Sequence, residues 1–144
     1  MEFDYVVVGA GSAGCAVASR LSQCGNYSVA LVEAGPPDNN PWIHVPVGYF
    51  STMGNPKSDW RYETQPDTGI AGRSIPWPRG RVMGGSSSIN GLLYVRGQPQ
   101  DFDIWSQLGC MGWSWDEVLP YFKRSENWDG IDETGLRGKE GPLS

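Results

Sequence analysis

Apolar runs and a helical repeat alternate along the first 35 residues, with glycine between them. Residues 3–8 form an apolar run broken only by Asp4, a pattern typical of a strand buried on both faces of a parallel sheet. From Ser12 to about Cys24, small and apolar residues recur at helical spacing, and residues 28–33 form a second apolar run. Strand, glycine turn, helix and strand predict a βαβ unit with a right-handed crossover.

The helical and strand patterns end after Gly35. Residues 36–79 contain proline, glycine and spaced aromatic residues, with neither a helical nor a strand repeat. A stretch of this length without regular structure is unusual inside a compact domain. We therefore expect a functional insertion that packs through its aromatic side chains.

Two helices are predicted in the second half of the chain. One covers about residues 101–108, and the other begins at Ser114. Ser114 and Glu117 have the spacing of a capping box, which satisfies backbone donors at a helix start. Pro120 lacks a backbone N–H and is expected to kink or restart this second helix. Beyond residue 127 the chain becomes polar and glycine-rich.

The amino-acid composition indicates a globular protein that does not bind nucleic acid. The chain has 144 residues, enough for one ordinary domain, and 39% of them are hydrophobic, as in globular proteins. Its 20 glycines and 11 prolines indicate many turns and irregular segments. A net charge of -5 argues against nucleic acid as a partner, because a phosphate backbone requires clustered basic residues.

Cysteine spacing gives no sign of a metal site or a disulfide framework. Cys15, Cys24 and Cys110 lie far apart, and His44 is the one histidine that could join them as a ligand. The apolar run begins close to Met1, which leaves no room for a charged leader, and no segment approaches the ~20 apolar residues of a membrane span. We therefore expect a cytoplasmic protein.

The first chemical motif lies between the first strand and the first helix. Gly9, Gly11 and Gly14 fit the pattern G-x-G-x-x-G, in which they permit a tight turn, a close approach to a pyrophosphate and close packing of helix on strand. Ser12 and Ala13 open the helix, so their free amides and the positive end of the helix dipole would face a diphosphate.

Glu33 ends the second strand, where an acidic side chain accepts hydrogen bonds from an adenosine ribose. The same carboxylate would repel a 2′-phosphate, which disfavours NADP. The first motif therefore leaves NAD and FAD as candidates. A second glycine-rich stretch, residues 80–91, brings backbone amides and hydroxyls together and could hold another part of an anionic cofactor. Alone it is a weak signal, because Gly and Ser runs are often linkers.

The second stretch resembles the first signature of the glucose-methanol-choline (GMC) oxidoreductase family, which runs from G-R-x-x-G-G-S-S through Asn and an aromatic residue to an acidic one. The matching positions are Gly80 to Ser87, Asn90, Tyr94, Gly97 and Asp103. The resemblance extends over the whole chain, from the strand at Phe3 and Glu33-Ala34-Gly35 to Trp105, Gly112-Trp113-Ser114-Trp115 and residues 118–122. Met83 departs from the pattern, which more often has Leu or a branched aliphatic residue there.

The resemblance implies FAD, bound without a covalent link. Relatives with a covalent flavin attach it through a histidine in the second motif, where this chain has Ile89. The residues that the resemblance and the two motifs assign to the cofactor are Gly9, Gly11, Ser12, Ala13, Gly14 and Glu33 on the diphosphate and adenosine side, and Val82, Gly85, Ser86, Asn90, Gly91, Leu92 and Leu93 along the diphosphate and flavin.

The same resemblance implies an enzyme that oxidises an alcohol by hydride transfer to the flavin, with a histidine near the end of a longer chain as the base. His44 is not expected to be that base, so no catalytic residue is assigned here. The fold expected is α/β, the amino-terminal part of a Rossmann-like FAD-binding domain. It is incomplete without downstream segments of the same polypeptide or a complementary chain, because two strands alone leave apolar faces uncovered.

Four segments are expected within that partial domain: 1–35 as the βαβ unit, 36–79 as the excursion, 80–103 as the second FAD motif, and 104–144 as helices and a tail toward the substrate domain. Other readings remain open. Some relatives are lyases or photodecarboxylases, and the isolated chain could be an inert fragment. An NAD-binding module is disfavoured because the second motif lacks further strand and helix alternation.

Overall fold

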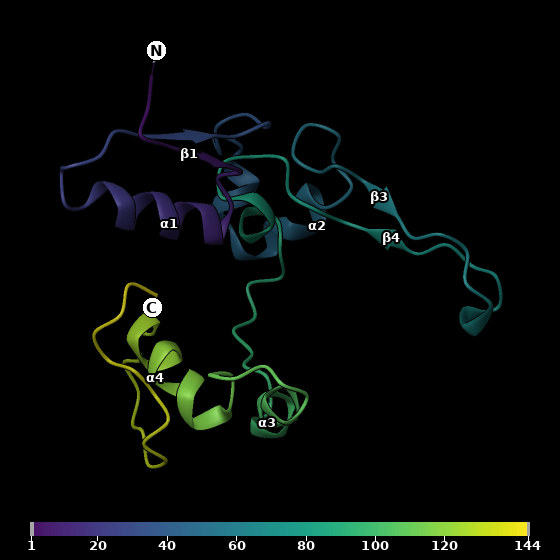
Figure 1. Ribbon diagram of the computed structural model, residues 1–144. Helices are drawn as coiled ribbons and strands as arrows, with labels where there is room; N and C mark the ends of the chain where they lie inside the picture. Colours follow the sequence, from purple (N-terminus) through teal and green to yellow (C-terminus); the bar gives the residue numbers. More distant parts are fainter. Residues whose placement is uncertain (1, 144) are drawn as a thin grey trace. The chain divides into compact units, whose positions relative to one another are not determined.

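A computed structural model describes residues 2–143 of the chain (Figure 1), which divides into two compact units, Met1–Leu93 and Tyr94–Ser144. Within residues 2–143, no helix is long and apolar enough to cross a membrane.

The first unit begins with the predicted βαβ arrangement. Strands β1 (Tyr5–Val8) and β2 (Val29–Val32) pair in parallel, and helix α1 (Ser12–Ser22) between them contacts both strands (Figure 1). All three elements lie inside their predicted ranges and are shorter by one or two residues at their ends. Asp4 ties the strand entrances together, because its Oδ2 accepts hydrogen bonds from Ser28 N and Ser28 Oγ, both at 2.7 Å.

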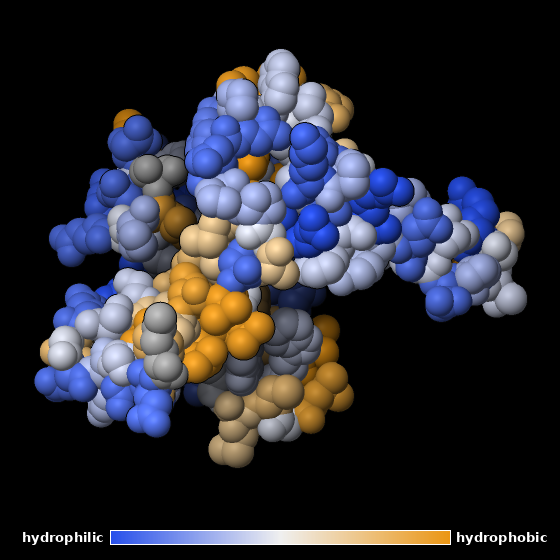
Figure 2. Space-filling model, turned by 90° about the horizontal axis from the view of Figure 1, so that it is seen from above, coloured by the Kyte–Doolittle hydropathy of each residue, from blue (hydrophilic) through white to orange (hydrophobic). Residues whose placement is uncertain are grey.

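The apolar runs predict that both strands are buried on both faces, and this prediction is wrong. Val6 is 59% exposed, Val8 83% and Val32 49%, so large apolar side chains face outward. Figure 2 shows that hydrophobic residues gather in patches on the face that it draws. The physical reason is that one helix covers a two-stranded sheet on one side, and nothing in residues 2–143 forms the layer that a fully buried parallel sheet requires.

Residues 36–79 contain more regular structure than the sequence pattern predicts. Short 3₁₀ helices η1 (Pro41–His44) and η2 (Pro46–Gly48) precede helix α2 (Tyr49–Thr52). Beyond them, strands β3 (Tyr62–Glu63) and β4 (Pro76–Trp77) form an antiparallel hairpin whose loop contains η3 (Thr68–Ile70). Two residue pairs make up this hairpin, too few for a period of two to be visible in the sequence.

The second unit is built on two helices. Helices α3 (Pro99–Gln107) and α4 (Trp115–Ser125) pack together through Phe102, whose ring centroid lies 5.7 Å from those of both Trp115 and Phe122. The predicted capping box is present, since Ser114 donates to Glu117 Oε2 from both its nitrogen (3.1 Å) and its hydroxyl (2.6 Å). Of the two effects expected of Pro120, a kink or a restart, the restart is wrong, because α4 is a single helix through this residue, and the kink stays a prediction.

A buried carboxylate organises the end of the second unit. Glu126 is 5% exposed and lies directly after α4. Its Oε2 accepts hydrogen bonds from Arg96 Nη2 (2.6 Å) and Gly138 N (2.9 Å), and its Oε1 accepts one from Arg137 Nη1 (2.8 Å). Burial raises the pKa of Glu126, but these hydrogen bonds and the two guanidinium charges outweigh burial and hold the pKa below its usual value.

Candidate functional site

The two glycine motifs lie against each other in the first unit, although they are far apart in the sequence. Gly84 N donates a hydrogen bond to Ala10 O at 2.8 Å, and Gly11 and Gly84 form an isolated parallel bridge. The hydroxyls of Ser12 and Ser87 are 3.0 Å apart and hydrogen-bonded. The second motif forms the 3₁₀ helix η4 (Gly85–Ser88), which contacts α1. One continuous backbone surface therefore combines both motifs.

Glycine is required where the motifs meet. Gly85 has a left-handed φ of +59°, and a Cβ on it would come within 2.8 Å of Gly11 Cα. Gly14 has a different reason, since its Cβ would overlap the carbonyl of Gly9 and touch Val7 Cγ1 at 3.5 Å. Gly85 therefore keeps the two motifs in contact, and Gly14 lets α1 pack closely on β1.

The start of α1 presents free backbone donors. Its N-cap, Gly11, has no side chain to cap the first turn, and Cys15 N is the first amide to find a helical acceptor, Gly11 O at 2.9 Å. The amides of Ala13 and Gly14 have no acceptor among residues 2–143, whereas the parallel bridge between Gly11 and Gly84 directs the Ser12 amide toward Gly84 O. Together with the positive end of the helix dipole, the two free amides form an anion-binding turn suited to a diphosphate.

Glu33 lies beside this turn, at the end of β2. Its Oε2 accepts a hydrogen bond from Ala10 N at 2.8 Å, and its Oε1 accepts one from Gly35 N at 2.9 Å. The carboxylate therefore fixes the loops after both strands. Each carboxylate oxygen has a second lone pair, so Glu33 can still accept hydrogen bonds from ribose hydroxyls.

A hollow of about 520 Å³ opens where these elements meet, a size within the usual range for small-molecule sites. Five of the residues predicted from the sequence line it: Gly9, Gly11, Glu33, Gly85 and Ser86. The hollow is also lined by residues outside that predicted set, which are Val8, Val32, Ala34, Trp60, Tyr62, Arg79 and Gly80.

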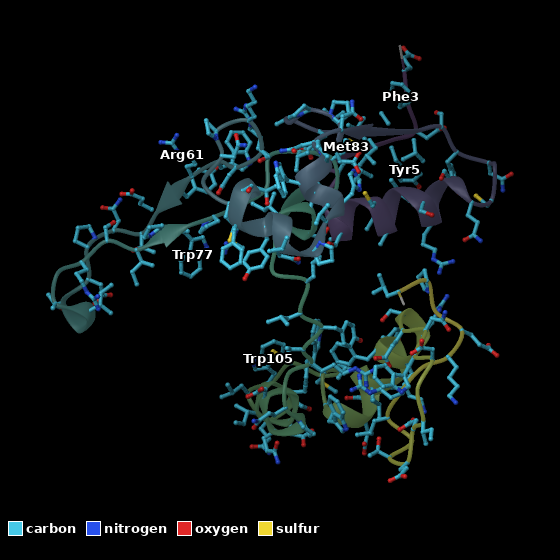
Figure 3. All side chains as sticks on the ribbon, turned by 180° about the vertical axis from the view of Figure 1, so that it is seen from behind. Phe3, Tyr5, Arg61, Trp77, Met83 and Trp105 are labelled. Atoms are coloured by element: carbon cyan, nitrogen blue, oxygen red, sulfur yellow. The ribbon has the colours of Figure 1, made fainter. Side chains whose placement is uncertain are left out.

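The signal for the missed hairpin residues is weak but present in the sequence. Trp60 and Tyr62 are two positions apart, the spacing of side chains on one face of an extended segment, and Trp77 and Arg79 have the same spacing on the segment that pairs with it. The pairing of Tyr62 with Trp77 places these side chains on one face of the hairpin. In Figure 3, Arg61 and Trp77 project from opposite faces of the hairpin.

The other predicted cofactor residues lie outside the hollow. Val82 is 1% exposed, and its carbonyl accepts a hydrogen bond from Gly85 N at 2.7 Å. Its side chain is therefore buried, and its backbone stabilises the turn of the second motif. Asn90, Gly91, Leu92 and Leu93 follow η4 without regular structure and do not line the hollow. Leu92 has a φ of +58°, and its amide donates to Asn90 Oδ1 at 3.0 Å.

The GMC oxidoreductase family model matches residues 3–143 of the chain. The chain belongs to this family. Among curated GMC relatives, it is 52% identical over 143 residues to the oxygen-dependent choline dehydrogenase of Brucella anthropi, and 50% identical over 144 residues to that of Vibrio vulnificus. Both comparisons cover 99% of this chain, against 26% and 25% of the relatives, so the chain spans about a quarter of their length.

Solved GMC structures resemble the chain over nearly its whole length. Pyridoxine 4-oxidase from Mesorbium loti has a TM-score of 0.88 and 41% identity, covering 98% of this chain and 28% of that protein. Formate oxidase of Aspergillus oryzae RIB40, an FAD protein, has a TM-score of 0.83 and 36% identity, covering 97% of this chain and 26% of that protein.

Family membership confirms the resemblance and the fold class derived from the sequence: the chain is mixed α/β and corresponds to the amino-terminal part of larger GMC oxidoreductases. It also confirms FAD as the cofactor, because GMC oxidoreductases are FAD-binding proteins. The free amides of the α1 turn and the carboxylate of Glu33 fit the diphosphate and ribose of such a cofactor.

Proposed function

We propose that this chain is the cofactor-binding part of an enzyme that oxidises an alcohol by hydride transfer to non-covalently bound FAD. The observation that carries the proposal is the junction of the two glycine motifs, where Gly84 N bonds to Ala10 O at 2.8 Å. This junction supports a single cradle for both halves of a dinucleotide.

Different residues of the two glycine motifs and Glu33 bind different parts of the cofactor. The amides of Ala13 and Gly14 hold the diphosphate at the turn that Ser12 opens, and Glu33 accepts hydrogen bonds from the ribose hydroxyls. Bound FAD would supply a ring that accepts a hydride. The resemblance to the family assigns the flavin side of the cofactor to residues of the second motif and beyond it: Val82, Gly85, Ser86 and Asn90 to Leu93. Ile89 cannot form a bond to the flavin, which supports non-covalent attachment.

Two relatives support the proposed substrate class. Choline and pyridoxine, which name the dehydrogenases and one of the oxidases, are both alcohols, which supports a CH–OH donor. A base is needed near the substrate hydroxyl. His44 is unsuited to this role because it is exposed, lies outside the hollow and has its Nε2 2.7 Å from Asp38 O. The base is therefore assigned to a part of the enzyme beyond this chain.

The segments keep their predicted roles in this proposal: 1–35 and 80–103 hold FAD, 36–79 contributes the hairpin, and 104–144 leads to the substrate domain. The apolar faces of β1 and β2 support a continuing polypeptide or complementary chain as the partner that completes the sheet. Three exposed cysteines without a disulfide support a reducing, cytoplasmic location.

The test is the absorption spectrum of the full-length protein, before and after denaturation and filtration. Flavin that passes the filter supports non-covalent FAD, whereas flavin retained on the protein contradicts it. The same preparation is then assayed with choline and with simple primary alcohols, using oxygen or an artificial acceptor. Absence of flavin from both native and FAD-supplemented protein would refute the proposed function.

A further inference from the structure

One buried side-chain nitrogen in the second glycine motif has no hydrogen-bond partner among residues 2–143. It is the Nε atom of Arg81, and no other buried side-chain nitrogen or oxygen in that part of the chain is left without a partner. Buried polar groups in proteins nearly always find a partner, and an unpaired one is costly. Arg81 is therefore suited to a partner that lies beyond those residues.

Arg81 differs in this respect from the other arginines that stack on aromatic rings. Its guanidinium carbon lies 5.4 Å from the centroid of the Trp60 ring, and its side chain makes no hydrogen bond or ion pair within residues 2–143. Three other guanidinium groups stack in the same way and also donate a side-chain hydrogen bond to the chain, those of Arg79, Arg96 and Arg137. A stacked guanidinium keeps its donors along its edges, where a planar acceptor can bind them.

The backbone holds Arg81 in one place. Its amide donates a hydrogen bond to Ser58 O at 2.8 Å, and a Cβ on Gly35 would overlap the Arg81 carbonyl. The next residue, Val82, is 1% exposed. The chain on both sides is therefore packed tightly, and the Arg81 side chain extends from a fixed point of the second motif.

The acidic residue beside Trp60 does not provide the partner. Asp59 is 3% exposed, and its oxygens accept hydrogen bonds from the amides of Gly54 (2.7 Å), Arg61 (2.8 Å) and Arg79 (2.9 Å). Arg81 is also absent from the residues that line the hollow beside the α1 turn, which disfavours a phosphate group of the cofactor as its partner.

We propose that Arg81 binds a carboxylate side chain of the remaining part of the enzyme, and that this ion pair ties the second glycine motif to that part. The chain spans about a quarter of the length of its curated relatives, so a longer polypeptide can provide the carboxylate. The arginine fork is always charged and matches the two oxygens of a carboxylate. The proposal rests on the continuing polypeptide of the proposed function and is independent of its flavin chemistry.

The test is the melting temperature of the full-length enzyme, with and without FAD, between about pH 4 and about pH 8. Arg81→Gln leaves the partner carboxylate buried without its cation, so near pH 7.5 the Tm should fall by at least about 3 °C. An unpaired buried carboxylate has a raised pKa, and it takes up a proton as the pH falls. The Tm difference from wild type should therefore shrink toward about pH 4 and be equal with and without FAD.

Arg73→Gln is the matched control, because it removes the same charge from an exposed turn of the same unit, where Arg73 Nε donates to Ile70 O at 2.9 Å. It should change the Tm by less than about 1 °C at any pH. Arg81→Lys, which keeps the charge but not the fork, should recover part of the loss. Should Arg81→Gln yield no folded protein, Arg81→Lys is compared with Arg73→Lys, and an equal Tm in the two would overturn the proposal.

Three results with Arg81→Gln would also overturn the proposal. A loss of Tm that occurs only with FAD would identify a cofactor phosphate as the partner. A loss that stays constant down to about pH 4 would exclude a carboxylate, and a loss no larger than that of Arg73→Gln would mean that no partner is bound. Wild-type protein that binds no FAD would refute the proposed function instead, while the comparison without FAD would still decide the role of Arg81.

Discussion

Gly85 lies so close to Gly11 that a Cβ on Gly85 would come within 2.8 Å of Gly11 Cα. This contact joins the turn after β1 to the first residue of η4, and the hydrogen bond from Gly84 N to Ala10 O continues the junction at 2.8 Å. The cradle therefore depends on backbone proximity between two distant segments, and a single methyl group at this point should separate them.

Gly85→Ala should lower the affinity for FAD by at least about tenfold. The new Cβ meets backbone at Gly11, and an alanine at a left-handed φ costs about 1–2 kcal/mol. The measurement is FAD titration of apoprotein by flavin fluorescence. Gly25→Ala is the control, because Gly25 has a φ of +70° but open space around its Cβ. It should carry the backbone strain without loss of FAD affinity, and equal FAD loss in both variants would contradict the prediction.

Glu33→Gln should weaken the cradle although it preserves the shape of the side chain. Both carboxylate oxygens accept backbone amides, from Ala10 and Gly35, and the glutamine NH₂ would face one of these donors. An unsatisfied donor of this kind costs about 1–3 kcal/mol, so both thermal stability and FAD affinity should fall. Glu63→Gln, on the exposed β3 strand, should change neither. Wild-type stability and affinity in Glu33→Gln would show that these hydrogen bonds contribute little.

Much of the first unit could be predicted because its signals are local. The βαβ unit follows from apolar periodicity, and the anion-binding turn follows from glycine spacing. The burial of its strands could not be predicted correctly, because Val8 reads as a core residue while the layer that would cover it lies outside residues 2–143. An apolar pattern predicts that a residue is suited to burial, but it does not say which part of the protein covers that residue.

The hairpin residues that line the hollow, Trp60, Tyr62 and Arg79, have only a weak signal in the sequence, for a different reason. Trp60 and Arg79 meet through a hydrogen bond from Trp60 N to Arg79 O at 2.9 Å, across a long loop. This pairing depends on Asp59, whose carboxylate accepts hydrogen bonds from the amides of Arg61 and Arg79, one on each side of that loop. Nothing in the sequence near Asp59 identifies those partners. The hydrogen bond between the hydroxyls of Ser12 and Ser87 could not be predicted either, because a serine hydroxyl can bond to many kinds of partner and the sequence does not say which.

Glu126→Ala should strongly destabilise the second unit. The side chains of Arg96 and Glu126 are 11% and 6% exposed, so removal of the carboxylate leaves a guanidinium group largely buried without its partner. Breaking a buried pair in this way costs about 3–5 kcal/mol. Urea denaturation followed by tryptophan fluorescence measures the loss, and the exposed Glu140→Ala serves as control. A loss no larger than that of the control would show that the pair is solvated in solution.

Asp132 should make the 132–137 loop sensitive to acid. Its Oδ2 accepts a hydrogen bond from Arg137 N at 2.9 Å, and its Oδ1 accepts bonds from Thr134 Oγ1 at 2.8 Å and Thr134 N at 3.1 Å. The Arg137 amide foremost, followed by the Thr134 hydroxyl, lowers the pKa of Asp132 from 3.8 to about 2. Because the folded pKa is the lower one, the stabilisation is complete above the unfolded value and is lost as pH falls through the folded value.

The expected result is therefore a stability difference between wild type and Asp132→Asn that is constant near neutral pH and shrinks from about pH 4 to about pH 2. Asp129→Asn removes the same charge from a neighbouring position that makes no side-chain hydrogen bond within residues 2–143, and it should show no such window. Carboxyl chemical shifts of Asp132, followed by NMR during acid titration, measure the pKa directly. A midpoint at the ordinary value for aspartate would mean that the loop hydrogen bonds do not persist in solution, and the stability difference should then follow the Asp129→Asn control.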